Sequence, residues 1–201
     1  NSSLLRYGGD IAVGAMTILS SVMQFSMLPL QGLTQGAQPI VSFNYGAGNM
    51  ERVKKAFFLL LRACVIYSTL LWAVAVFVPQ AFIMIFTSDA DLSAYTEWAM
   101  RIYMAMSLIF GIQVACQQTF IALGNAKTSL FLAVLRKIIL LIPLIFVLPL
   151  FFTDKAMAVF LAEPVADTLA VATTATMFFV QFRKFLKRME KGTKSEEKAE
   201  A

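Results

Sequence analysis

Two acids in the apolar segment "AEPVAD" are the residues best suited to chemistry in this chain. Glu163 and Asp167 are four residues apart, so a helix places both carboxylates on one face. Pro164 between them lacks a backbone donor, which frees carbonyl oxygens that can add ligands for a cation. A low dielectric and a close like charge both oppose ionisation, so such a pair can carry a proton or hold a monovalent cation. The alternative is that Glu163 meets outside water and Asp167 bonds a neighbouring helix.

A second group of polar residues follows one face of the first apolar stretch. At about 100° per residue these side chains fall within one arc of a helix. They are Ser20, Gln24, Gln31, Thr34, Gln35 and Gln38. Two interpretations stay open: the lining of a water-filled cavity, or hydrogen bonds between packed helices. On the same stretch Gly32 and Gly36 form a GxxxG pattern, whose physical use is close approach of two helix backbones.

The third apolar stretch mixes glutamine, methionine and aromatic residues. Such a surface suits adaptable binding of flat amphiphiles, because methionine repacks easily and aromatic rings stack on cations. Core packing is the competing interpretation for any single methionine or phenylalanine. The candidates for a substrate cavity are therefore Gln24, Gln31, Gln35 and Gln38 from the first stretch, with Gln113, Gln117, Met106 and Phe110 from the third.

Two common bases of enzyme catalysis are missing from the sequence. The chain has no histidine, which removes histidine general bases, histidine metal ligands and the usual catalytic triads. It also has no phosphate-cradling loop of the Walker type. We therefore expect a protein that is not an enzyme, with no metal site and no organic cofactor.

The composition predicts a membrane protein. The chain is 59% hydrophobic and 14% charged, with a mean hydropathy of +0.72. A bilayer core about 30 Å thick requires about 20 apolar residues per helix, and five stretches meet this need or come close to it. The predicted fold is an all-α polytopic bundle that forms one transmembrane lobe over residues 1–182. Its expected spans are residues 10–45, 55–87, 97–124, 128–153 and 156–182.

The basic residues are distributed unevenly between the two ends of these spans. Of the 17 Lys and Arg, 14 are assigned to one side, and this count includes Arg136 and Lys137 at the start of the fourth span. The positive-inside rule then places that side and the carboxy terminus in the cytoplasm. Arg136 and Lys137 are expected to extend toward lipid headgroups, and residues 183–201 to form a basic, disordered cytoplasmic tail. The positive charge indicates contact with membrane lipid, and no nucleic acid is expected as a partner.

Three segments of the sequence resemble a known family. They are "GLTQGAQPIVSFNYGAGNMERVKKA", "ALGNAKTSLFLAVLRKIILLIPLIFVLP" and "LAEPVADTLA". Together they resemble the carboxy-terminal half of the multidrug and toxic compound extrusion (MATE) family of bacterial exporters. The resemblance implies a twelve-helix transporter of two six-helix lobes, of which this chain is an incomplete second lobe that lacks most of its first helix. A chain that begins at Asn1 and has five spans agrees with such a fragment.

The resemblance also implies a function. Members of the family export cationic amphiphilic drugs and dyes across the bacterial inner (cytoplasmic) membrane, in exchange for inward flow of H+ or Na+. The missing amino-terminal lobe is then a partner of this one. In the sodium-linked branch, acids on the seventh and tenth helices bind the cation, but this chain has no Asp or Glu between Arg101 and Lys127. The proposal for Glu163 and Asp167 therefore rests on the physics of burial and not on the family.

Two other functions remain as alternatives. One is a flippase for lipid-linked oligosaccharides from the same superfamily. Its anionic pyrophosphate cargo requires Arg or Lys inside the cavity, and the sequence predicts none deep in the spans. The other is a structural membrane subunit that transports nothing.

Overall fold

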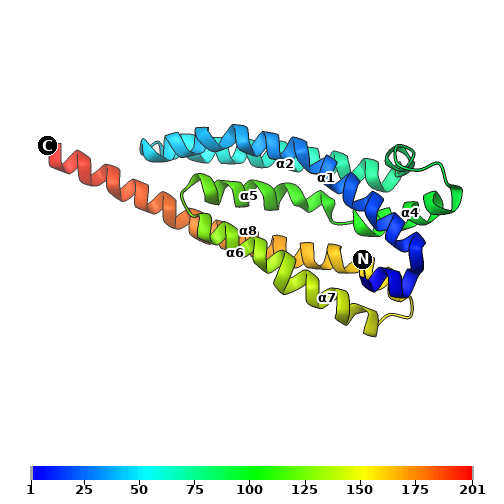
Figure 1. Ribbon diagram of the computed structural model, residues 1–201. Helices are drawn as coiled ribbons and strands as arrows, with labels where there is room; N and C mark the ends of the chain where they lie inside the picture. Colours follow the sequence, from blue (N-terminus) through cyan, green and yellow to red (C-terminus); the bar gives the residue numbers. More distant parts are fainter. Residues whose placement is uncertain (1, 201) are drawn as a thin grey trace.

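The structure is a computed structural model that describes the backbone of residues 2–200 and the side chains of residues 3–187. Within these residues all regular elements are helices, which pack lengthwise against one another (Figure 1). In chain order they are α1 (Ser2–Gly46), α2 (Met50–Phe77), α3 (Gln80–Ile83), α4 (Ala90–Tyr103), the 3-10 turn η1 (Ser107–Ile109), α5 (Phe110–Ala122), α6 (Ala126–Val134), the π-helical segment η2 (Leu135–Leu141), α7 (Ile142–Val147), the 3-10 turn η3 (Leu148–Leu150) and α8 (Lys155–Glu200).

The helices confirm the predicted all-α bundle of about five spans. In the described part of the chain, four helical stretches are long and apolar enough to cross a bilayer. A fifth is formed by α4 together with η1 and α5, which are bent by 46° at the break between them. The turns after α1 and α5 and the end of α8 lie at one end of the bundle, and the start of α1 and the turn before α8 lie at the other (Figure 1).

The second span ends at Phe77, ten residues before the predicted limit at residue 87. Val78 has φ −133° and lies directly before Pro79, whose ring disfavours the helical conformation of the preceding residue. The residues that follow remain apolar and form the short helix α3. Hydropathy alone could not detect this end, because the composition does not change where the backbone does.

The third span begins at Ala90 instead of residue 97 and is broken in its middle. Asp89 caps α4 because its carboxylate accepts a hydrogen bond from the backbone N–H of Leu92, at 2.9 Å. At the break, the Ser68 hydroxyl of α2 donates to the carbonyl of Leu108, also at 2.9 Å. This bond satisfies a backbone acceptor at the break between α4 and α5.

The tail predicted to be disordered is instead part of α8, which continues to Glu200. Lys, Glu, Met and Ala are strong helix formers, and they extend a helix that the apolar span has already nucleated. This end of α8 projects beyond the other helices (Figure 1). Residue 201 lies outside the described residues.

Glycines make the two turns at the end of the bundle where α8 projects. Gly48 follows α1 with φ 72° and Gly124 follows α5 with φ 79°. A side chain is strained in this left-handed region, whereas glycine is not. The next residue then bonds back into the helix: Asn49 N–H donates to the Asn44 carbonyl and Asn125 N–H to the Phe120 carbonyl, both at 2.8 Å. The glycines therefore reverse the chain within a few residues.

A cluster of aromatic rings joins α2, α5 and α8. The ring centroid of Phe178 lies 4.6 Å from that of Phe57 and 5.1 Å from that of Phe120. All three side chains are fully buried. The cluster fixes α8 against the other two helices, which also sets the position of the acids about three and four turns before Phe178 on α8.

Asn125 gives a prediction about how α6 is held. Its carboxamide oxygen accepts from the Thr128 hydroxyl at 2.9 Å, and its nitrogen donates to the Gln181 side chain of α8 at 2.7 Å. Asn125→Ala should therefore lower the free energy of unfolding by about 1–2 kcal/mol. The measurement is thermal unfolding of the purified protein in detergent. Asn49→Ala is the matched control, because Asn49 also precedes a helix but makes no side-chain cap hydrogen bond; equal losses in the two variants would contradict the prediction.

Candidate functional site: a charged cluster beside a polar cavity

Arg136 and Lys137 lie in the middle of the membrane-spanning stretch that runs from Ala126 to Leu150. The expectation that they open this span at the cytoplasmic surface is wrong. Asn125 caps α6 well before the charge-free run begins, so the helix is longer than that run. Both residues belong to the π-helical segment η2, which precedes Pro143. Because Pro143 has no N–H, it cannot complete the regular helical bonding of the turn before it.

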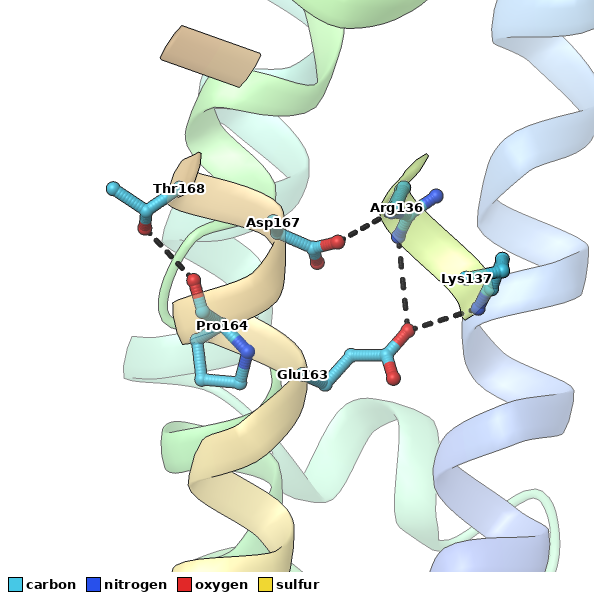
Figure 2. Close-up of polar contacts among 6 residues, drawn as sticks. All are labelled: Arg136, Lys137, Glu163, Pro164, Asp167 and Thr168. Carbon is cyan, nitrogen blue, oxygen red and sulfur yellow. Dashed lines mark hydrogen bonds and ion pairs between the residues drawn. The ribbon is translucent and has the colours of Figure 1, made fainter. Parts of the chain in front are cut away.

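The two basic residues contact the two acids of α8 (Figure 2). Arg136 Nε donates to Asp167 Oδ1 at 2.5 Å, and the Arg136 Nη2 atom lies 3.7 Å from Glu163 Oε1. Lys137 Nζ donates to the same Glu163 oxygen at 3.1 Å. We call these four residues the charged cluster; its formal charges cancel. The acids therefore do not form the isolated like-charge pair that the sequence suggested, and each has a basic partner.

The charged cluster has a buried half and an open half. The side chains of Asp167 and Arg136 are 3% and 18% exposed. Glu163 is 8% exposed, whereas its partner Lys137 is 57% exposed. The Arg136 guanidinium also lies 4.6 Å from the centroid of the Phe110 ring, a cation–π contact. Arg136 and Asp167 thus form a largely buried pair inside the lobe. Lys137 is the most exposed member of the charged cluster.

The backbone of α8 continues through Pro164 without a break. Thr168 donates its hydroxyl hydrogen to the Pro164 carbonyl at 2.8 Å, so this oxygen already has a partner (Figure 2). The helix keeps Glu163 and Asp167 on one face, as their spacing predicts. The carbonyl that the missing N–H of Pro164 frees is that of Phe160, one turn earlier, and the Thr168 bond does not involve it.

The charged cluster borders a cavity of about 420 Å³. Polar residues of α1, methionines of α1 and one tyrosine of α4 share its wall with three members of the cluster. The lining comprises Ser20, Met23, Gln24, Met27, Leu28, Gln31, Tyr103, Arg136, Lys137 and Glu163. Amide groups, an aromatic ring, methionines and charges of both signs thus face one space, a combination that suits binding of amphiphilic molecules.

The structure separates the predicted cavity residues into several places. Gln24 and Gln31 line the cavity, whereas Gln35 and Gln38 lie further along α1 and outside it. In α5, Gln113 is buried, and Gln117 donates to the Ser129 carbonyl of α6 at 3.1 Å. These two glutamines pack between helices and do not line the cavity, since α5 directs them toward its neighbours.

The two apolar candidates also lie apart. Phe110 is buried beneath Arg136 and supports the charged cluster from below. Met106 lines a different cavity of about 450 Å³, in which Pro164 and Leu169 also take part. Met106 lies in the break between α4 and η1, and is not part of α5.

Sequence reasoning missed Arg136 and Lys137 as members of the site. The signal was present in "LFLAVLRKIILLIPL", where two basic residues are flanked by apolar residues on both sides. Charged side chains inside a membrane pair with one another, so two bases in one span and two acids in the next predict a cluster. The charge-free runs hid this, because they end at any charge.

Charges and a polar cavity inside a bundle of apolar helices are typical of membrane transport proteins. A family model described as MatE matches residues 1–147. The chain therefore belongs to the MatE family, whose members are transporters. The match ends before α8, so Glu163 and Asp167 lie beyond it.

Curated relatives agree with this assignment. The multidrug export protein MepA of Staphylococcus aureus is 26% identical over 146 residues, which cover 72% of this chain and 32% of that protein. A protein named FAD transporter from Shewanella oneidensis is 26% identical over 133 residues, or 66% of this chain and 29% of that protein. The chain thus spans about a third of the length of these relatives.

Solved structures share the fold. The MATE multidrug transporter DinF-BH, determined in complex with R6G, is 34% identical with a TM-score of 0.75, and the match covers 89% of this chain and 40% of that one. A MATE structure in the bent conformation reaches a TM-score of 0.87 at 14% identity, over 94% of this chain and 42% of that one. The second likeness concerns the fold alone.

Proposed function

We propose that this chain is the carboxy-terminal lobe of a secondary active multidrug exporter that moves cationic amphiphilic drugs or dyes by antiport. The observation that carries the proposal is the cavity lined by Gln24, Gln31 and Tyr103 beside the charged cluster, in a chain of the MatE family. Glu163 is the acid that reaches this cavity, so it is the group that can meet a cargo cation. The R6G complex of DinF-BH supports a dye as cargo.

The coupling ion of the antiport is H+ or Na+ in this proposal. Glu163 and Asp167 are the candidate acids, and their different surroundings suggest different roles. Asp167 binds Arg136 in the buried half of the charged cluster, whereas Glu163 borders the cavity and can exchange its partner. Rocking of this lobe against an amino-terminal lobe would open the cavity to each side of the membrane in turn.

The proposed location is the bacterial cytoplasmic membrane with the carboxy terminus in the cytoplasm. Two of the 14 residues assigned to the inner side, Arg136 and Lys137, lie inside a span. The remaining basic residues still lie mostly at the end of the bundle where α8 projects, which supports this orientation.

The flippase alternative is less well supported. A pyrophosphate cargo calls for basic groups that are free to bind it. Arg136 and Lys137 are the basic residues of the cavity wall, and each is paired with an acid. Their charges are thus cancelled within the lobe before any cargo arrives.

The test is transport of a cationic dye by the complete transporter in vesicles, under H+ and Na+ gradients imposed separately. We expect that one of the two gradients drives transport of the dye and that the other does not. The 201-residue chain by itself should not drive transport, because alternating access needs two lobes. Gradient-driven transport by this chain alone would contradict the half-transporter proposal, and gradient-independent binding without transport by the complete protein would contradict the exporter function.

A further inference from the structure

We propose that Lys137 is a tethered competitor of the cargo: its ammonium occupies the Glu163 carboxylate in the empty cavity, and a cargo cation binds by displacing it. Lys137 then determines both the affinity of the cavity for cations and the range of charges that it accepts. This inference rests on the proposed function, because it takes the cavity as the cargo site.

The structure distinguishes a fixed ion pair from an exchangeable one. Arg136 is held by Asp167 and by the ring of Phe110, and both members of that pair are largely buried. Lys137 makes one ion pair among the described side chains, to Glu163, and more than half of its side chain is exposed. Lysine also carries a compact charge on a flexible stem and lacks the planar fork with which arginine holds a carboxylate at two points. Lys137 is therefore the partner that can leave.

The charges in the cavity wall make this exchange necessary for a cationic cargo. The wall contains two bases and one acid, and Asp167 behind it balances Arg136. Lys137 already neutralises Glu163, so a cation that entered without displacing Lys137 would find no unpaired acid in this wall. When Lys137 swings away, the cargo cation takes its place at Glu163 and the local balance of charge is restored. Glu163 meanwhile retains the Arg136 Nη2 atom at 3.7 Å, so it is never left buried without a basic neighbour.

The departure of Lys137 does not expose a buried ammonium, because 57% of its side chain is already exposed beside the cavity. Gln24 and Gln31 line the same cavity, and their side-chain oxygens are acceptors for the displaced ammonium. The cargo class that follows is a lipophilic organic cation whose charge can reach Glu163 and whose apolar part contacts Met23 and Met27.

The experiment measures binding of two probes with the same shape and opposite charge, tetraphenylphosphonium and tetraphenylborate, to the complete transporter in detergent. Lys137→Gln should bind the phosphonium cation roughly tenfold more tightly, because it removes the competitor. It should not bind the borate anion more tightly. Glu163→Gln should weaken binding of the cation. Lys127→Gln is the matched control: it removes a lysine at the start of α6, outside the charged cluster, and should change neither affinity.

The opposite result would overturn the inference. If Lys137→Gln leaves the phosphonium affinity unchanged, Lys137 is not a competitor. If the main effect of Lys137→Gln is a loss of borate binding, Lys137 is an anion site and again not a competitor. Lys137→Arg supplies an independent test, because a competitor that binds Glu163 more firmly should weaken phosphonium binding.

Thermal unfolding of each variant shows which are folded. No ion gradient is applied, so tighter binding together with absent transport would leave this inference standing and contradict only the exporter function.

Discussion

Asp167→Leu should lower the free energy of unfolding by about 3–5 kcal/mol, the largest loss that we expect from a single substitution in this chain. Arg136 would then lie largely buried with its nearest acid, Glu163, at 3.7 Å and already bound to Lys137. The penalty comes from the basic charge that is left behind, and little of it comes from the hydrogen bond itself. Unfolding of the purified protein in detergent measures this loss.

A second substitution distinguishes this cause from a general defect in packing. Arg136→Met combined with Asp167→Leu removes both charges, and it should recover most of the lost stability, since well-packed apolar residues can replace a buried pair. Leu169→Ala is the control on the same helix, because Leu169 is 48% exposed and should cost little. Asp167→Leu should also reduce coupled efflux of the complete transporter far more than Leu169→Ala does. If the double variant is no more stable than Asp167→Leu alone, the interpretation based on an unpaired charge is wrong.

Gly111→Ala should destabilise the packing of α5 against α2 by about 3 kcal/mol. A Cβ atom at this position would collide with the backbone carbonyl of Cys64 and would lie 2.7 Å from the Ser68 hydroxyl oxygen. A backbone carbonyl cannot move aside like a flexible side chain, so the two helices would have to separate. This separation would also disturb the bond from Ser68 to Leu108 at the break before α5.

Gly36→Ala is the matched control for this prediction. A Cβ atom at Gly36 would meet nothing within 4 Å, and alanine is the better helix former by about 1 kcal/mol. Thermal unfolding in detergent should therefore show a loss for Gly111→Ala and none for Gly36→Ala. Equal stability of the two variants would sink the prediction.

The glycines also show that a sequence motif does not by itself locate a contact between helices. Gly32 and Gly36 form the GxxxG pattern, yet a Cβ at either position would meet no neighbour within the described lobe. Gly111, which belongs to no such motif, is the glycine at the close approach of two helices. A pattern along one helix gives the spacing of small residues, but it cannot tell which face of the helix another helix covers.

The sequence by itself was sufficient for the class of fold and for the helix face that the two acids share. A stretch of about 20 apolar residues must form a helix in a bilayer, whatever its neighbours, because its backbone groups have no other partner. The spacing of Glu163 and Asp167 likewise placed them on one face of α8, since the helical repeat is a local property. The glycine turns after α1 and α5 follow from local backbone strain.

The tertiary structure alone decided what these residues contact. Arg136 and Asp167 are 31 residues apart in the chain, and they meet only because η2 and α8 lie side by side at a particular rotation. That rotation depends on the π-helical segment, on the prolines and on the aromatic cluster, and no local pattern contains it. The same packing brought Gln24 and Gln31 to the cavity and placed Gln113 and Gln117 between helices. It also buried Glu163 and left Lys137 exposed, and this difference makes Lys137 the partner that can leave.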